Sequence, residues 1–165
     1  MVLFINCVTS LTQKVHSNIN GGDVAGRNTW PWIVRLEIVV SGVRGNGDCG
    51  GTIIDDRLIV TAAHCVQGAT EVRAFLGDHD SVAQDRNERM VTTSTFVVHP
   101  NYRQLSSGAL QFDVAIVKFN EQLTDGILAD RACLPASTNL TLDNAKCWTA
   151  GWGNSDYRGT LLKEV

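Results

Sequence analysis

Two residues in this sequence, His64 and Asp113, have side chains and neighbours suited to proton transfer. His64 lies in the run from Thr61 to Cys65 (TAAHC), where small neighbours permit close backbone packing. Asp113 opens the apolar run Asp113–Phe119, and a carboxylate buried there needs a partner such as an imidazolium. An imidazole held by a carboxylate can act as a general base. Taken alone, each residue has a plainer interpretation: a structural histidine beside a strand, and an aspartate that caps a turn.

No serine in the sequence has the setting of a catalytic nucleophile. A nucleophilic serine of the kind that pairs with such a histidine is expected in a Gly-Asp-Ser-Gly context. The serines at 94, 106, 107, 137 and 155 all lack that context, and we nominate none of them. We therefore expect the 165-residue chain to show no amide hydrolysis by itself.

Short β-runs separated by turn residues are expected to position the two side chains. Apolar and β-branched runs predict strands, and clusters of Gly, Asn and Asp predict turns between them. A helical turn is expected only over Ala62–Val66. The expected strands are Ile33–Val40, Thr52–Ile54, Leu58–Thr61, Glu71–Leu76, Met90–Val98 and Val114–Phe119. Short strands at this spacing are typical of a closed antiparallel barrel or a sandwich.

Composition places the chain among globular proteins and limits its partners. It is 44% hydrophobic and 19% charged, with a net charge of −3 and no basic stripe, so nucleic acid is not an expected partner. No apolar run approaches the roughly 18 residues that span a membrane. Cys49 and Cys65 can close a short loop, which favours an oxidising, secreted setting. Asn139 begins an N-glycosylation triplet, which agrees with secretion.

Several short motifs surround His64 and Asp113 in a fixed order. They are Ile19–Gly22 (INGG), Trp30–Trp32 (WPW), Cys49–Ile54 (CGGTII), Thr61–Cys65, Asp113 and Cys147–Gly153 (CWTAGWG). This order, with a separation of 49 positions from the histidine to the aspartate, resembles that of the trypsin- and chymotrypsin-like serine proteases, peptidase family S1. The resemblance implies an all-β fold: a complete trypsin-like antiparallel Greek-key β-barrel, followed by a second barrel that is only begun.

The resemblance also implies a role for each member of the pair. His64 would take a proton from the attacking serine and return it to the leaving amine, while Asp113 would hold the histidine tautomer. The family's serine, oxyanion hole and specificity pocket belong to its second barrel. The chain is therefore expected to be truncated before the nucleophile.

By the same resemblance the chain divides into four segments. Residues 1–18 would be a signal remnant or a propeptide, and residues 19–133 the first barrel. Residues 134–146 would connect the barrels, and residues 147–165 would begin the second.

Cysteine pairing and activation follow from the resemblance as well. Cys133 corresponds to a position that pairs with a propeptide cysteine, for which Cys7 is the candidate. Cys147 corresponds to one whose partner lies beyond the last residue of this sequence. Family zymogens are usually cut after Arg or Lys, whereas Asn18 precedes Ile19 here, so tryptic activation at this bond is not expected.

The loop after Gly77 has two interpretations. Its spacing of carboxylates resembles the family's calcium loop, and carboxylate and carbonyl oxygens suit that ion. The calcium ligands would be Asp78, Asp80, Ala83, Asp85 and Glu88. The alternative is a solvated acidic loop neutralised by the arginines at positions 86 and 89. Calcium would be structural, and catalysis would need no cofactor.

Two functions remain open at this stage. The first is a secreted, extracellular serine endopeptidase, present as an incomplete chain, with protein or peptide substrates and protease inhibitors as partners. The second is a non-catalytic protease homologue that acts as a binding module. A metal enzyme is not supported, because no His-Glu-x-x-His or comparable cluster accompanies His64.

Overall fold

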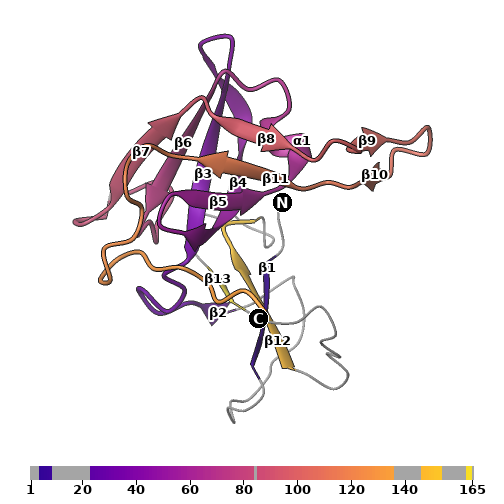
Figure 1. Cartoon of the computed structure of the whole chain (residues 1–165). Helices are drawn as coiled ribbons and strands as arrows, with labels where there is room; N and C mark the ends of the chain where they lie inside the picture. Colours follow the sequence, from indigo (N-terminus) through magenta and orange to yellow (C-terminus); the bar gives the residue numbers. More distant parts are fainter. Residues whose placement is uncertain (1–3, 9–22, 84, 136–145, 154–162, 165) are drawn as a thin grey trace.

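The regular secondary structure of the described residues is almost entirely β-strand, with turns and loops between the strands (Figure 1). The computed structural model describes residues 4–8, 23–83, 85–135, 146–153 and 163–164. Within them there is one helix, α1 (Ala63–Val66), and none is long and apolar enough to cross a membrane. The strands are β1 (Phe4–Val8), β2 (Asp23–Val24), β3 (Ile33–Val40), β4 (Val43–Asp55), β5 (Leu58–Thr61), β6 (Glu71–Leu76), β7 (Arg89–Thr93), β8 (Phe96–Val98), β9 (Arg103–Gln104), β10 (Leu110–Gln111), β11 (Ala115–Lys118), β12 (Lys146–Gly151) and β13 (Lys163–Glu164).

Seven of the strands form one antiparallel sheet in the order β7-β6-β3-β4-β5-β11-β8. Strands β3, β4 and β5 follow one another as a meander, and β6 then returns to lie beside β3. This arrangement of four strands is a Greek key.

The sheet curls so that its two edge strands, β7 and β8, approach each other where the chain passes from one to the other. Only Ser94 and Thr95 separate β7 from β8, although these strands stand at opposite ends of the strand order. Thr93 Oγ1 of β7 donates to the carbonyl of Lys118 on β11 at 2.7 Å, which links the two ends of the sheet. The Lys118 N–H donates to the carbonyl of Thr95 at 2.9 Å, which continues the pairing of β11 with β8. The expected antiparallel Greek-key barrel is therefore confirmed, and the sandwich alternative is wrong.

The barrel interior is filled by branched aliphatic side chains from alternate positions of the strands. The largest fully buried side chains are Phe119, Leu36, Ile53, Ile59, Leu76, Leu123, Val34, Val66, Val72, Val91 and Val117. Gly51 lies in this interior, where an added Cβ would come within 2.5 Å of a methyl carbon of Ile59. The Cys-Gly-Gly motif thus has a packing reason, since a side chain at its second glycine would collide with the core.

Strand β3 is buried on both faces, and its outer face carries charges. Val34 and Leu36 point into the core with no exposed surface, while Arg35 and Glu37 between them are only 5% and 7% exposed. Buried charges need partners. Arg73 on β6 supplies one to Glu37 at 2.8 Å, and the partner of Arg35 is described with the acidic loop below.

A second, smaller sheet has the order β1-β12-β13-β2 and lies below the barrel in Figure 1. Trp30 joins the two regions: its ring centroid lies 5.8 Å from that of Trp32, in a T-shaped contact, and 6.4 Å from that of Trp148. The expected connector, residues 134–146, lies largely outside the described residues.

Most of the expected strands are found, but Thr52–Ile54 is only the last part of β4, which begins at Val43. Ile33–Val40, Leu58–Thr61 and Glu71–Leu76 are β3, β5 and β6. The single strand expected over Met90–Val98 is wrong, because the chain turns at residues 94 and 95 to close the barrel. The turn is held by the Thr95 N–H, which donates to Thr93 Oγ1 at 3.0 Å.

Candidate active site

Strand register brings His64 and Asp113 to one end of the barrel. Strands β5 and β11 are antiparallel, with Thr61 opposite Ala115. The chain that leaves β5 into α1 therefore lies beside the chain that enters β11. His64 follows Thr61 by three residues and Asp113 precedes Ala115 by two, so both side chains extend from the same edge of the sheet.

His64 and Asp113 are joined by two hydrogen bonds, one from the backbone and one from the side chain of His64. The backbone N–H of His64 donates to Asp113 Oδ1 at 2.8 Å, and His64 Nδ1 lies 2.6 Å from Asp113 Oδ2. A carboxylate oxygen accepts, so Nδ1 carries the proton and the neutral ring keeps its lone pair on Nε2. The histidine side chain is 36% exposed, and its Nε2 lies 3.6 Å from Cys65 Sγ. The expected pairing is thus present in the geometry.

A tight turn fixes the position of Asp113. The Val114 N–H donates across it to the carbonyl of Phe112 at 2.8 Å, and the His99 N–H donates to the carbonyl of Val114 at 3.0 Å. Phe112 has a φ of 53°, a left-handed conformation that is unusual for a bulky residue. Its ring stacks on the imidazole of His99, with centroids 5.0 Å apart. The sequence pattern indicates a turn before Asp113 but not the left-handed conformation of Phe112.

Opposing effects set the protonation of Asp113. Burial raises the pKa of its carboxyl, but the hydrogen bonds from the backbone and ring of His64 act in the other direction, and the net pKa lies below the ordinary value. Asp113 is therefore ionised at neutral pH and can hold the Nδ1 proton of His64.

The disulfide between Cys49 and Cys65 is present as expected. It joins β4 to α1, with 6.3 Å between the two Cα atoms. Since Cys65 follows His64 directly, the bridge fastens the helical turn that carries the imidazole to the sheet. The grouping of Cys49, His64 and Cys65 is consequently not a metal site, because both sulfurs are bonded.

The expected bridge between Cys7 and Cys133 is not formed in this structure. Cys133 is exposed and has a free thiol. In the backbone register of β1 and β12, Cys7 lies opposite Cys147. The glycosylation triplet at Asn139 lies outside the described residues.

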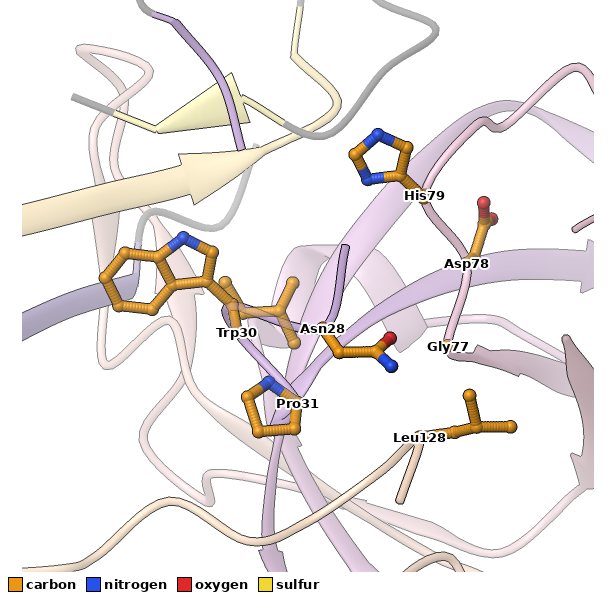
Figure 2. Close-up of a pocket in the computed structure, with 8 residues that line it drawn as sticks. Asn28, Trp30, Pro31, Gly77, Asp78, His79 and Leu128 are labelled. Atoms are coloured by element: carbon orange, nitrogen blue, oxygen red, sulfur yellow. The ribbon is translucent and has the colours of Figure 1, made fainter. Parts of the chain in front are cut away.

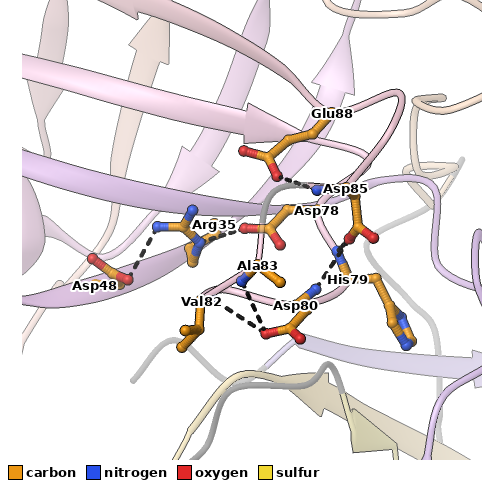
Figure 3. Close-up of polar contacts among 9 residues, drawn as sticks. All are labelled: Arg35, Asp48, Asp78, His79, Asp80, Val82, Ala83, Asp85 and Glu88. Carbon is orange, nitrogen blue, oxygen red and sulfur yellow. Dashed lines mark hydrogen bonds and ion pairs between the residues drawn. The ribbon is translucent and has the colours of Figure 1, made fainter.

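The acidic loop, residues 77–88, holds its carboxylates with partners from the protein (Figure 3). Asp85 Oδ2 accepts from the N–H groups of His79, at 2.7 Å, and Asp80, at 3.1 Å, while its Oδ1 pairs with Arg27. Asp78 Oδ2 pairs with Arg35. The expected neutralisation by the arginines at 86 and 89 is not what the structure shows.

Asp80 and Arg89 make further hydrogen bonds, neither of them with another carboxylate of the loop. Asp80 Oδ1 accepts from the N–H groups of Val82 and Ala83, at 3.1 and 3.4 Å, so this carboxylate closes a local turn. Arg89 turns away from the loop and donates to the carbonyls of residues 122 and 123.

One observation favours a cation at this loop. Carboxylate oxygens of Asp78, Asp85 and Glu88 lie within 4.8 Å of one another. Asp78 Oδ1 is buried and accepts no hydrogen bond. Burial raises the pKa of both Asp78 and Glu88. The donor set nevertheless does not fit a calcium ion as it stands, because Asp78 and Asp85 are each already paired with an arginine and Asp80 is used by the backbone.

A small pocket is lined in part by Gly77, Asp78 and His79 of the acidic loop and contains neither His64 nor Asp113 (Figure 2). Its lining residues are Asn28, Trp30, Pro31, Ile33, Gly77, Asp78, His79 and Leu128. His79 Nδ1 is buried there without a hydrogen-bond partner. The pocket is therefore separate from the pair formed by His64 and Asp113.

A Greek-key barrel that sets an imidazole against a carboxylate at one end, with a disulfide fastening the histidine, defines the chymotrypsin-like class of serine proteases. The comparisons agree. The family model described as "Trypsin" matches residues 19–165. The chain therefore belongs to the trypsin family, peptidase family S1.

Curated relatives include "Chymotrypsin-like elastase family member 1" from Homo sapiens and from Bos taurus. The human protein is 31% identical over 165 residues, which are 100% of this chain and 63% of the relative. The bovine protein is 30% identical over 152 residues, which are 92% of this chain and 56% of the relative. This chain thus spans little more than half the length of these relatives.

A solved structure titled "Structure of GrC" shares the fold. Its TM-score is 0.73 at 24% sequence identity, and the match covers 88% of this chain and 63% of that one.

Proposed function

We propose that this chain is the histidine- and aspartate-bearing part of a secreted serine endopeptidase. The observation that carries the proposal is the double hydrogen bond by which Asp113 holds both the backbone N–H and the Nδ1 proton of His64. Secretion is supported by the disulfide between Cys49 and Cys65.

In the proposed reaction, His64 Nε2 removes the proton from an attacking serine hydroxyl. The imidazolium that forms is stabilised by the ionised Asp113 and then gives the proton to the leaving amine. Asp113 itself stays deprotonated. The serine and the N–H donors for the oxyanion are proposed to lie in sequence that follows this chain, since no serine here has a Gly-Asp-Ser-Gly setting.

The test is covalent labelling with a serine-directed fluorophosphonate. The 165-residue chain is expected to remain unlabelled, whereas a polypeptide extended by the coding sequence after Val165 is expected to react. Labelling of the extended polypeptide is expected to fail in His64→Ala. Asp113→Asn is expected to be slower by roughly 10⁴-fold, as in other enzymes of this class. Labelling of the 165-residue chain at a site that requires His64 would overturn the proposal.

A second candidate is a non-catalytic homologue that binds a partner. It is favoured by the missing nucleophile alone. Transcripts decide between the two: a Gly-Asp-Ser-Gly-Gly coded downstream of Val165 supports the peptidase, and a stop codon in full-length transcripts supports the binding module.

A further inference from the structure

Arg35 is a buried cation on the outer face of a barrel strand. Its side chain is only 7% exposed, and the side chain of its partner Asp78 is completely covered. Arg35 lies on β3 opposite Phe75 of β6, and Asp78 follows the end of β6 by two residues. The register of two strands therefore brings the guanidinium to the start of the acidic loop.

Three groups hold the guanidinium in place. Arg35 Nε pairs with Asp78 Oδ2, and Arg35 NH1 donates to Asp48 Oδ2 at 3.1 Å. Its carbon Cζ lies 3.9 Å from the centroid of the Phe75 ring, a cation–π contact. Figure 3 shows Arg35 between the two aspartates, with Asp78 turned toward the loop.

On its loop side, Asp78 faces further negative charge. Its carboxylate oxygen lies within 4.8 Å of oxygens of Asp85 and Glu88. Its Oδ1 is buried and has no hydrogen-bond partner. Three converging carboxylates require compensating positive charge, and Arg35 is the cation that touches the most deeply buried of them.

We propose that Arg35 is the built-in cation of the acidic loop, so that the loop keeps its structure without a divalent ion. The guanidinium binds Asp78 from the strand side. A calcium ion at the unpartnered Asp78 Oδ1 would share this carboxylate with a fixed positive charge and be repelled by it. Removing Arg35 would leave a set of hard oxygen donors without a cation, which is the chemistry that calcium prefers.

The experiment compares melting temperatures in EDTA and in millimolar calcium chloride, with sodium chloride to match the ionic strength. The wild-type chain is expected to shift by less than about 1 °C. Arg35→Met is expected to melt at a lower temperature in EDTA. It should then gain about 3 °C or more once calcium exceeds its dissociation constant tenfold. Terbium luminescence sensitised by tryptophan gives a second readout of binding by the same two proteins.

The matched control is Arg27→Met, which removes an arginine from the same loop at an exposed position. Its side chain is 63% exposed, so its loss is expected to create no calcium response. If Arg35→Met does not fold, the double variant Arg35→Met/Asp78→Asn removes both charges. That variant is expected to fold and to lack the calcium response, because a neutral amide replaces the buried carboxylate.

Three results would overturn the proposal. The first is a calcium-dependent rise of several degrees in the wild-type chain, or terbium binding by it. The second is an Arg35→Met chain as stable in EDTA as the wild type. The third is an Arg35→Met chain that is destabilised and whose melting temperature does not rise with calcium. This result would show that the loop does not bind a cation in place of Arg35. None of these readouts depends on proteolysis, so they are independent of the proposed peptidase function.

Discussion

Two charge pairs in this barrel, Arg35–Asp78 and His64–Asp113, use the same kind of contact in different surroundings. The side chains of the first pair are 7% and 0% exposed, and those of the second are 36% and 23% exposed. In the first pair the guanidinium is enclosed by protein. In the second the imidazole is partly exposed to solvent. Burial gives the first pair a structural role, and the partial exposure of the second agrees with the proposed proton transfer.

The pKa values of Asp78 and Asp113 are shifted in opposite directions, because burial and hydrogen bonding contribute differently in the two pairs. Burial raises the pKa of Asp78 above its ordinary value, and the contacts with Arg35 do not cancel this effect. Burial also raises the pKa of Asp113, but there the hydrogen bonds from His64 outweigh it and the net pKa is lowered. Desolvation dominates where water is excluded, and hydrogen bonds to the charged form dominate where it is not.

The largest difference in unfolding free energy is expected when one partner of the buried pair is removed. Asp78→Ala leaves the guanidinium of Arg35 buried with only the partly exposed Asp48 as a carboxylate partner. We expect a loss of about 3–5 kcal/mol of unfolding free energy, measured by urea denaturation. Asp48→Ala is the control. It removes a carboxylate whose side chain is 25% exposed, and its cost is expected to be about 1 kcal/mol. Equal losses in Asp78→Ala and Asp48→Ala would show that burial does not set the difference.

Removing the carboxylate of the exposed pair, His64–Asp113, should cost less unfolding free energy, and this cost should depend on pH. Asp113→Asn keeps the shape of the side chain but removes the charge that the two hydrogen bonds of His64 favour. We expect it to cost about 1–2 kcal/mol at pH 7, the range for hydrogen bonds to a charged group with part of the site exposed.

The pH dependence follows from the direction of the pKa shift. The carboxyl of Asp113 has a lower pKa in the folded chain than its ordinary value of 3.8. Its stabilising contribution is therefore complete above the ordinary value and is lost as the pH falls through the lowered one. Urea denaturation of wild type and Asp113→Asn at pH 7, 5, 4 and 3 should show a constant difference down to pH 5 and a shrinking one below pH 4. A difference that grows on acidification would contradict the assignment.

The contacts that the sequence could predict were those between neighbouring motifs or those implied by the order of motifs in the family. The Thr61–Cys65 run lies next to an apolar strand, and its cysteine has one nearby partner in Cys49. The pairing of His64 with Asp113 and the disulfide were therefore predictable from spacing and family resemblance. The partner of Arg35 was not, because it depends on which residue of β6 lies opposite β3.

Two local features escaped prediction for a different reason. Phe112 adopts a left-handed φ of 53°, which β-rich sequence patterns do not indicate for an aromatic residue. The break at residues 94 and 95 occurs inside a run of good strand formers, because closure of the barrel requires a turn there. In both cases tertiary structure overrides local preference. Arg35 and Glu37 alternate with Val34 and Leu36 along β3. In the structure these two charged residues are buried, so the outer face of the strand is also covered.

The weakest effect is expected at the third charge pair, which tests the exposed limit of the comparison. Arg27 pairs with Asp85, but its side chain is 63% exposed, and the backbone N–H groups of His79 and Asp80 bind Asp85 independently. We expect Arg27→Ala to cost at most about 0.5 kcal/mol by urea denaturation. Because exposed ion pairs are screened, the difference should disappear by about 1 M sodium chloride, whereas the loss in Asp78→Ala should persist. If Arg27→Ala loses more than about 1 kcal/mol of unfolding free energy and salt does not reduce this loss, the pair behaves like Arg35–Asp78. Exposure of the side chain would then not determine how much an ion pair stabilises the fold.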